Sequence, residues 1–320
     1  MTSTPTRSAS TPTAPGTTSH PPPRRRRRFT ARDRHDFWVF LALVLPNAAL
    51  IVAFAYRPVI ENVRYSLLNW TLGSPSATFV GLGNYVTFLT SPSSAEIVWT
   101  TLVFTVVTVG GSMVLGLLIA LALNRRVPGT GVARAAVFSP YVLSGVGVGL
   151  VWLFVFDPSI GVLGAVVRAF GGTAPDFFND PSMSLAMICI VYVWKNMGYA
   201  AVIYLAGLQS IPKDLLEAAA LDGASSTRTF FRVVLPLLSP VTFFLVVTSA
   251  LNSLQAFDLI RIMTPLGQGT TTLIYEAYLQ AFGSSNRAGY SAAVSTVLFV
   301  VLVVFTLVQL RWMERRVHYA

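Results

Sequence analysis

Six long apolar runs constrain this chain more than any other feature. A helix needs about 20 apolar residues to cross roughly 30 Å of hydrocarbon. A run such as LVFTVVTVGGSMVLGLLIALAL is too long for one strand of an outer-membrane barrel. Hydrophobic residues make up 53% of the chain and charged residues 11%, which indicates an all-α polytopic membrane protein rather than a soluble domain. The six predicted transmembrane helices are residues 37–56, 97–123, 136–156, 184–209, 237–257 and 291–310.

The basic residues predict how the chain is oriented in the membrane. If the N-terminus is cytoplasmic and the spans alternate, the segments on the far side carry few cations and the cytoplasmic segments carry most of them. This asymmetry follows the positive-inside rule, so both termini are predicted to be cytoplasmic. The basic residues predicted on the outer side are Arg57, Arg64, Arg168, Arg261 and Arg287.

Residues 1–34 form a Ser/Thr/Pro-rich tail that ends in an arginine run, and residues 35–320 form the predicted membrane domain. The tail has little apolar surface to bury, so we expect it to be disordered. A polybasic segment beside a spanning helix binds anionic lipid headgroups. Nucleic-acid binding is not expected, because no folded or aromatic recognition element accompanies the arginines. The tail is therefore interpreted as a membrane-surface anchor.

A polar, basic segment, EAAALDGASSTRTFFRVVLP, interrupts the apolar runs at residues 217–236. Leu216 and Ala219 belong to one apolar side of a predicted short helix, and small residues keep that helix thin. Gly223 can adopt the left-handed conformation that ends a helix, and Pro236 is expected at the start of the next span, where a missing N–H costs little. The chemistry alone leaves two interpretations open, which are a docking helix for a partner and an amphipathic helix on the lipid surface.

The spacing of this segment resembles a known loop. It reads Glu-Ala-Ala, three residues, Gly, nine residues, then Val-x-Leu-Pro, with Val233 where isoleucine is commonest. This resembles the cytoplasmic EAA loop of ABC importer permeases, and LAGLQSIPKDLLEAAALDGA and FVGLGNY resemble the carbohydrate-uptake class of that family. The C-terminal part, from TTTLIYEAYLQAF onward, is most similar to the permeases of glycerol-3-phosphate and glycerophosphodiester uptake. The resemblance covers essentially everything after the tail.

The resemblance implies a fold, an activity and a set of partners. The chain would be the cell-membrane permease of an ATP-driven importer and would form half of the translocation pathway. A second homologous permease, two ATP-binding subunits and an extracytoplasmic substrate-binding protein would complete the assembly. The short helix of loop 210–236 would insert into a groove of an ATPase subunit. The implied coupling residues are Glu217, Ala218, Ala219, Asp222, Gly223, Arg228, Arg232 and Pro236.

The chain shows no pattern for catalysis or for a cofactor. It contains no G-x-x-x-x-G-K-[ST] sequence, so ATP hydrolysis is assigned to separate subunits. The histidines His20, His35 and His318 lie near the termini and suggest neither a metal site nor a catalytic triad. The single cysteine, Cys189, is expected to be a small packing residue. No catalytic residue, metal or cofactor is therefore predicted.

The predicted substrate pathway centres on Lys195, which is the one lysine or arginine inside a predicted span. Tyr192, Asn196 and Tyr199 recur with it at i, i+3, i+4 and i+7, so the four share one helical face. In the resembling sugar permeases, this face and one on the fifth span line the central cavity. An ammonium group there suits a phosphate better than a neutral sugar. The fifth-span residues are Ser249, Asn252 and Ser253.

Alternatives remain at each level. Lys195 could instead form a structural ion pair, for example with Asp258 or with a partner subunit. The importer could take a disaccharide or oligosaccharide in place of a phosphoester. A secondary transporter or an intramembrane enzyme would more typically show internal repeats or carboxylates within spans, and these spans have almost none. The SGVGVG sequence at residues 144–149 is interpreted as a close-packing surface, and Pro46 is expected to kink the first span.

Overall fold

The computed structural model describes residues 31–124 and 129–314, and these are mostly helical. The N-terminal tail up to residue 30 lies outside the described residues. The chain forms two compact units, Met1–Arg57 and Pro58–Ala320. In the first unit, α1 (Ala31–Ile51) continues into a π-helix, η1 (Val52–Tyr56). The helix α1 runs through Pro46, where a kink was expected.

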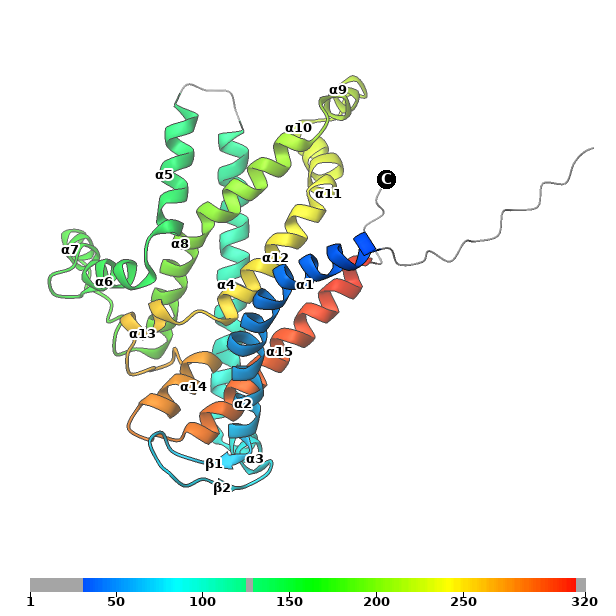
Figure 1. Ribbon diagram of the computed structural model, residues 1–320. Coiled ribbons are helices and arrows are strands. Elements are labelled where there is room, and N and C mark those ends of the chain that lie inside the picture. The colour runs from blue at the N-terminus through cyan, green and yellow to red at the C-terminus, as the bar shows by residue number, and fades with distance from the viewer. Residues whose placement is uncertain (1–30, 125–128, 315–320) are drawn as a thin grey trace, which may run out of the picture. The chain divides into compact units, whose positions relative to one another are not determined.

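The second unit holds the remaining elements (Figure 1), of which α2 begins at Arg57. Its helices before loop 210–236 are α2 (Arg57–Ser66), α3 (Gly83–Thr90), α4 (Pro92–Leu123), α5 (Thr130–Val142), α6 (Gly145–Phe156), α7 (Val162–Ala169) and α8 (Pro181–Ser210). The later helices are α9 (Lys213–Leu221), α10 (Ser226–Thr229), the π-helix η2 (Phe230–Val234), α11 (Leu235–Leu237), α12 (Ser239–Leu254), α13 (Asp258–Met263), α14 (Leu273–Phe282) and α15 (Ala288–Glu314). Two short strands, β1 (Leu68–Asn69) and β2 (Thr78–Phe79), pair antiparallel.

Five helical segments of the described chain are long and apolar enough to cross a membrane, and a bent pair of helices supplies a sixth. The predicted third span, 136–156, is not one continuous helix, because α5 and α6 meet at a bend of 97°. Leu143 and Ser144 take extended conformations there, with ψ of 146° and 134°. The five continuous segments are Phe37–Ser66, Pro92–Leu123, Pro181–Ser210, Ser239–Met263 and Ala288–Arg311.

The bend lets α6 pack closely against α13. A Cβ added at Gly145 would lie 3.0 Å from the Cβ of Asp258, and one at Gly149 would lie 2.9 Å from the side chain of Ile262. The glycines expected to be a close-packing surface therefore let α6 approach α13 closely.

Each π-helix directly precedes an X-Pro pair. In the first, the N–H of Arg57 donates to the carbonyl of Val52, five residues back, and Pro58 follows. In the second, the N–H of Leu235 donates to the carbonyl of Phe230, and Pro236 follows. A proline ring crowds the carbonyl four residues earlier, and we attribute the widened turn to this crowding. Pro236 thus lies within a helical path that begins at α10, and not at the first turn of the fifth span.

The long helices α4 and α8 pack closely through small residues. A Cβ at Gly116 of α4 would lie 2.6 Å from the Cβ of Ala200 and 2.9 Å from the backbone nitrogen of Ala201 in α8. Such contacts let two backbones approach, which is how helices gain van der Waals energy in lipid. A buried cluster that includes Leu205 and Leu245 extends this contact to α12.

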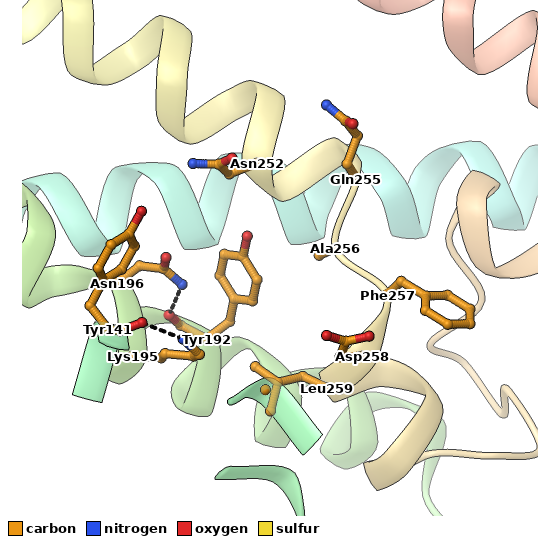
Figure 2. A pocket seen from close by; sticks show the side chains of 11 residues that line it. Tyr141, Tyr192, Lys195, Asn196, Asn252, Gln255, Ala256, Phe257, Asp258 and Leu259 are labelled. Carbon is orange, nitrogen blue, oxygen red and sulfur yellow. Dashed lines mark hydrogen bonds between the residues drawn. The ribbon is translucent and has the colours of Figure 1, made fainter. Parts of the chain in front are cut away.

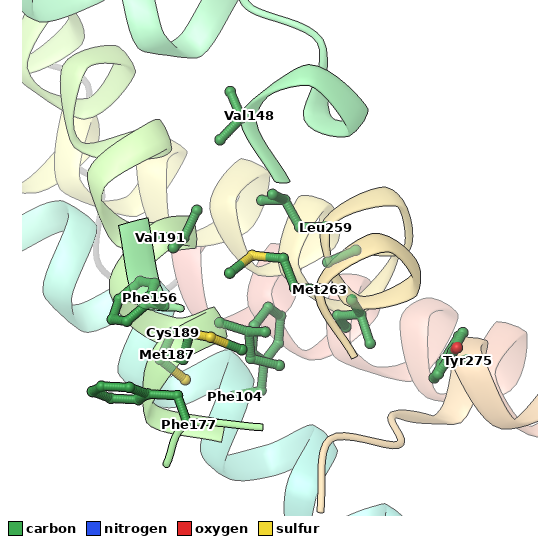
Figure 3. Packing of buried hydrophobic residues seen from close by; sticks show 13 residues of the cluster. Phe104, Val148, Phe156, Phe177, Met187, Cys189, Val191, Leu259, Met263 and Tyr275 are labelled. Atoms are coloured by element: carbon green, nitrogen blue, oxygen red, sulfur yellow. The ribbon is translucent and has the colours of Figure 1, made fainter. Parts of the chain in front are cut away.

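A second cluster of buried hydrophobic residues joins several helices of the second unit (Figure 3). Phe104 of α4 and Met187 of α8 meet Val148 of α6 and Met263 of α13 in one buried cluster. Cys189 belongs to the same cluster, in agreement with its predicted packing role. Figure 1 shows α9 at one end of the long helices and α3, α14 and the strand pair at the opposite end.

Candidate functional site

Four of the predicted pathway residues meet around one cavity of about 440 Å³. Tyr192, Lys195 and Asn196 reach it from α8, and Asn252 reaches it from α12 (Figure 2). The helix α8 holds its three residues on one face as their spacing requires. The other lining residues come from α5, the start of α6, and the segment from the end of α12 into α13. They are Tyr141, Gly145, Gln255, Ala256, Phe257, Asp258 and Leu259.

The ammonium of Lys195 is held by the end of a broken helix. Its Nζ donates a hydrogen bond of 2.8 Å to the carbonyl oxygen of Tyr141, and it lies 5.5 Å from the centre of that residue's ring. In a continuous helix, the N–H of Gly145 would reach the Tyr141 carbonyl, but the bend after Val142 prevents this. Lys195 therefore caps α5, where a cation also interacts favourably with the helix dipole.

A side-chain hydroxyl also satisfies a backbone carbonyl about one turn earlier in α5. Pro140 lacks an N–H, so the carbonyl of Ala136 loses its usual donor. The hydroxyl of Ser139 donates to that carbonyl at 3.0 Å. The last turns of α5 thus depend on side-chain donors.

Asp258 faces the same cavity as Lys195, but no ion pair joins them among the residues that the structure describes. The alternative of a structural ion pair with Asp258 is therefore not observed, and Lys195 donates to the carbonyl of Tyr141 instead. An ammonium carries three donors, so Lys195 keeps capacity for a ligand in the cavity. The cavity thus contains one cation and one carboxylate. Lys195 would attract an anionic ligand, and Asp258 would repel it.

Aromatic rings form one wall of the site. Tyr199 does not line the main cavity, but its ring stacks on that of Tyr141 with centroids 4.9 Å apart and planes at 19°. The ring of Tyr192 packs edge-to-face on Phe104, with centroids 5.1 Å apart. The backbone carbonyl of Tyr192 accepts a 2.8 Å hydrogen bond from the Asn196 amide. The stacked pair and Lys195 together fasten α5 to α8.

The predicted fifth-span residues separate in the structure. Asn252 lines the main cavity, whereas Ser249 lines only a smaller neighbouring space. Ser253 is 2% exposed, and its hydroxyl forms a 2.8 Å hydrogen bond with the hydroxyl of Thr108 in α4. The structure thus places Ser253 in the contact between α4 and α12 and away from the cavity.

Sequence reasoning missed Tyr141 and the contribution of α4. Tyr141 follows Pro140 and shortly precedes SGVGVG, which together could have signalled a helix end. In α4, Thr108 and Ser112 lie four residues apart, so they share a face. Both line the smaller space beside the main cavity, but hydroxyls four apart are common in apolar helices and gave no clear signal.

The predicted coupling loop contains a short helix with an exposed surface. The helix α9 ends in a Schellman motif, in which the N–H of Ala224 donates to the carbonyl of Ala219 and the N–H of Gly223 to that of Ala220. Gly223 has a φ of +70°, as expected for the residue that ends the helix. Ala219 is half-buried. Glu217, Ala218, Asp222, Gly223, Arg228, Arg232 and Pro236 are all exposed.

Apolar side chains beside this helix are exposed as well. Leu221 is 89% exposed and Phe231 is 60% exposed. Arg228 lies in α10 and Arg232 lies in the π-helix η2 that follows it, at the same end of the molecule. The loop therefore presents apolar and charged groups together on an outward surface.

The fold and the two regions define a polytopic helical membrane protein with a polar cavity among its spans and a projecting loop helix. A family model described as a binding-protein-dependent transport system inner membrane component matches residues 112–319. The chain belongs to this family. It is therefore a transport component of the inner membrane and not an enzyme, and its transport system depends on a binding protein. The predicted family and fold class are confirmed.

Individual relatives agree with this assignment. The sn-glycerol-3-phosphate transport system permease protein UgpA of Agrobacterium fabrum is 36% identical over 280 residues, which are 87% of this chain and 95% of the relative. The UgpA protein of Yersinia pestis is 33% identical over 285 residues, 88% of this chain and 96% of the relative. A solved bacterial ABC transporter that imports the acidic polysaccharide alginate superposes with a TM-score of 0.78 at 22% identity, covering 90% of this chain and 99% of that chain.

Proposed function

We propose that this chain is the permease subunit of an ATP-driven ABC importer and forms half of the pathway for sn-glycerol-3-phosphate or glycerophosphodiesters. The observation that carries the substrate class is Lys195, an ammonium at the wall of a polar cavity among the spans. A half-buried cation between apolar helices is costly unless a partner meets it. The Tyr141 carbonyl takes one donor, and a phosphate oxygen is a strong acceptor for the others.

The names of the relatives point to the same substrate class, since several are sn-glycerol-3-phosphate permeases at 32–36% identity over most of this chain. The remaining polar groups of the cavity suit the rest of such a molecule. Asn196, Asn252 and Gln255 offer amide donors and acceptors for glycerol hydroxyls.

An oligosaccharide is the second candidate, and the aromatic wall favours it. Tyr141, Tyr192 and Phe257 line the cavity beside polar groups, and flat rings provide apolar surfaces against which a sugar ring can pack. The two candidates differ in charge, so they predict different responses to changes at Lys195 and Asp258.

The proposed mechanism couples this cavity to ATPases through α9. A second, homologous permease would complete the pathway, and an extracytoplasmic binding protein would deliver the substrate. Two ATP-binding subunits would close on ATP and move α9, which would turn the cavity toward the binding protein. Hydrolysis would reset the assembly. The exposed Leu221 and Phe231 and the thin Ala218–Ala219 surface support a contact with a groove of the ATPase.

The test compares charge variants in vesicles that contain the whole importer and its binding protein. Lys195→Met should cut uptake of a radiolabelled phosphoester while the ATPase still co-purifies. Lys195→Arg should retain part of the activity, because a planar fork fits a point-charge site poorly. Asp258→Asn is the matched control. It removes a carboxylate from the same cavity, so it should not weaken the binding of an anionic substrate and should raise the apparent affinity for it.

The outcomes separate the candidates. If Lys195→Met transports the phosphoester normally, the lysine does not contact the substrate and the proposal for this class is wrong. If the variant complex falls apart, capping of α5 is its main role. If wild-type vesicles take up a disaccharide and no phosphoester, the oligosaccharide candidate replaces the first.

A further inference from the structure

A small polar niche lies beside the main cavity, at the junction of α4, α8 and α12. Its volume is about 10 Å³, which is close to the space that one water molecule or one hydroxyl group needs. It shares Tyr192, Asn196 and Asn252 with the main cavity. The niche is therefore next to the proposed pathway. Its other lining residues are Thr108, Val109, Ser112, Tyr199 and Ser249.

Ser112 is the unusual member of this niche. It is 2% exposed, and its hydroxyl has no hydrogen-bond partner. Two other hydroxyls on the same helix behave differently, because Thr101 and Thr108 donate to the carbonyls of Ile97 and Phe104, four residues earlier, at 2.7 Å. Serine and threonine in helices commonly make this bond. Ser112 does not make it, so its donor is left for a group that enters the niche.

None of the other hydroxyls that line the niche, in the described part of the chain, is bonded to Ser112. Thr108 donates to Phe104 and also bonds the hydroxyl of Ser253 at 2.8 Å. An unsatisfied buried hydroxyl costs free energy, and water or a ligand must recover it. The amide groups of Asn196 and Asn252 at the shared wall can hydrogen-bond the same guest.

We propose that this niche is a recognition site for one alcohol hydroxyl of the transported substrate, with Ser112 as its specificity-determining residue. The inference rests on the proposed transport function, but not on the choice between phosphoester and sugar, because both carry alcohol hydroxyls. When no substrate is present, one water occupies the niche. A substrate hydroxyl that reaches past Asn252 displaces this water and takes over its hydrogen bonds.

The experiment combines two serine variants with deoxy substrates. Wild-type vesicles are first offered a phosphoester and a disaccharide, and the class that is taken up is used from then on. If it is the phosphoester, uptake efficiency is measured for glycerol-3-phosphate and for its two deoxy analogues, each lacking one alcohol group. If it is the disaccharide, monodeoxy sugars take their place. Each variant is compared with wild type using the same binding protein, so recognition by that protein cancels.

Ser112→Ala should lower uptake of the full substrate about three- to tenfold, the value of one neutral hydrogen bond. Its effect should vanish for the one analogue that lacks the hydroxyl bound in the niche. Ser112→Val, which also fills the niche, should penalise the full substrate more than that analogue. An equal loss of uptake for every substrate would mean that the niche holds water only. No loss of uptake for any substrate would mean that Ser112 does not contact the substrate. Either result overturns the proposal, whichever substrate class the wild type takes.

Discussion

The coupling role of α9 can be tested at Gly223, where the structure separates effects within the chain from effects on a partner. The left-handed conformation at Gly223, with φ of +70°, is strained for any residue with a Cβ. This costs about 1–2 kcal/mol per residue, and less for asparagine. Apart from the two chain neighbours of Gly223, no atom of the described residues lies within 4 Å of a Cβ added there. Within this chain, alanine and leucine at this position should therefore be about equally costly.

A groove in an ATPase subunit would make alanine and leucine unequal. A bulky side chain forced into a tight contact costs about 1–3 kcal/mol, which weakens association roughly 5- to 150-fold. Gly223→Ala should couple less well than wild type, and Gly223→Leu should be far worse than Gly223→Ala. Glu217→Lys tests charge on the same helix, since in the described part of the chain the Glu217 side chain forms no hydrogen bond or ion pair.

The assay is ATP hydrolysis by the purified importer in vesicles, with and without loaded binding protein. Coupling is the ratio of the two rates, and co-purification reports whether the ATPase remains bound. Thermal melts of the variant permease control for the strain at Gly223. If Gly223→Leu melts and couples like Gly223→Ala, no surface approaches Gly223. If Glu217→Lys also keeps full stimulation, the docking role of α9 is wrong.

Three further predictions concern other regions. Deletion of residues 2–23 should leave uptake in vesicles nearly unchanged, because this Ser/Thr/Pro-rich sequence offers little apolar surface; loss of uptake in correctly inserted protein would show a further role. Gly116→Ala should lower the melting temperature of the protein in detergent because its Cβ would meet the backbone of α8, at a cost of about 1–3 kcal/mol, whereas Gly110→Ala, with open space around it, should not. Hydrogen bonds from the Ser182 side chain and from the first turn of α8 lower the pKa of Asp180 below its ordinary 3.8. Its stabilising effect should therefore be present near pH 6 and disappear as the pH falls through the lowered pKa, so the melting difference between wild type and Asp180→Asn should shrink toward pH 2.

The cavity face of α8 could be predicted because helix geometry alone fixes it. Tyr192, Lys195 and Asn196 lie within about one turn, and a lone cation in an apolar run indicates a polar surrounding. The fifth span was harder. Asn252 and Ser253 are consecutive, so they lie about 100° apart around the helix. Asn252 faces the cavity, while Thr108 of α4 binds Ser253. A contact from a helix 145 residues away leaves no trace in local spacing.

The bend between α5 and α6 shows why hydropathy could not predict the whole site. Residues 136–156 are apolar and long enough for one span, and only Pro140 and the glycines hinted at an interruption. Tertiary contacts determine the bend, since α6 gains close contacts with α13 through Gly145 and Gly149. Wherever a helix ends inside an apolar medium, its last carbonyls need donors from elsewhere.

This requirement links the two interpretations of Lys195. The bend leaves the Tyr141 carbonyl without an intrahelical donor, and Lys195 is the group that reaches it. A neutral donor could satisfy the carbonyl with one hydrogen, so capping alone does not require an ammonium. The hydrogen bond to Tyr141 leaves two donors of the ammonium unused, and Lys195 lines a cavity that also contains Asp258. A ligand that draws Lys195 toward the cavity would weaken the cap on α5, and one that binds beside the existing hydrogen bond would strengthen it by completing the ammonium's partners. Occupancy of the cavity and the stability of the bend are therefore coupled, in either direction, through the Lys195 side chain. Lys195→Arg keeps the charge but changes the shape of the cationic group, so it should alter both together.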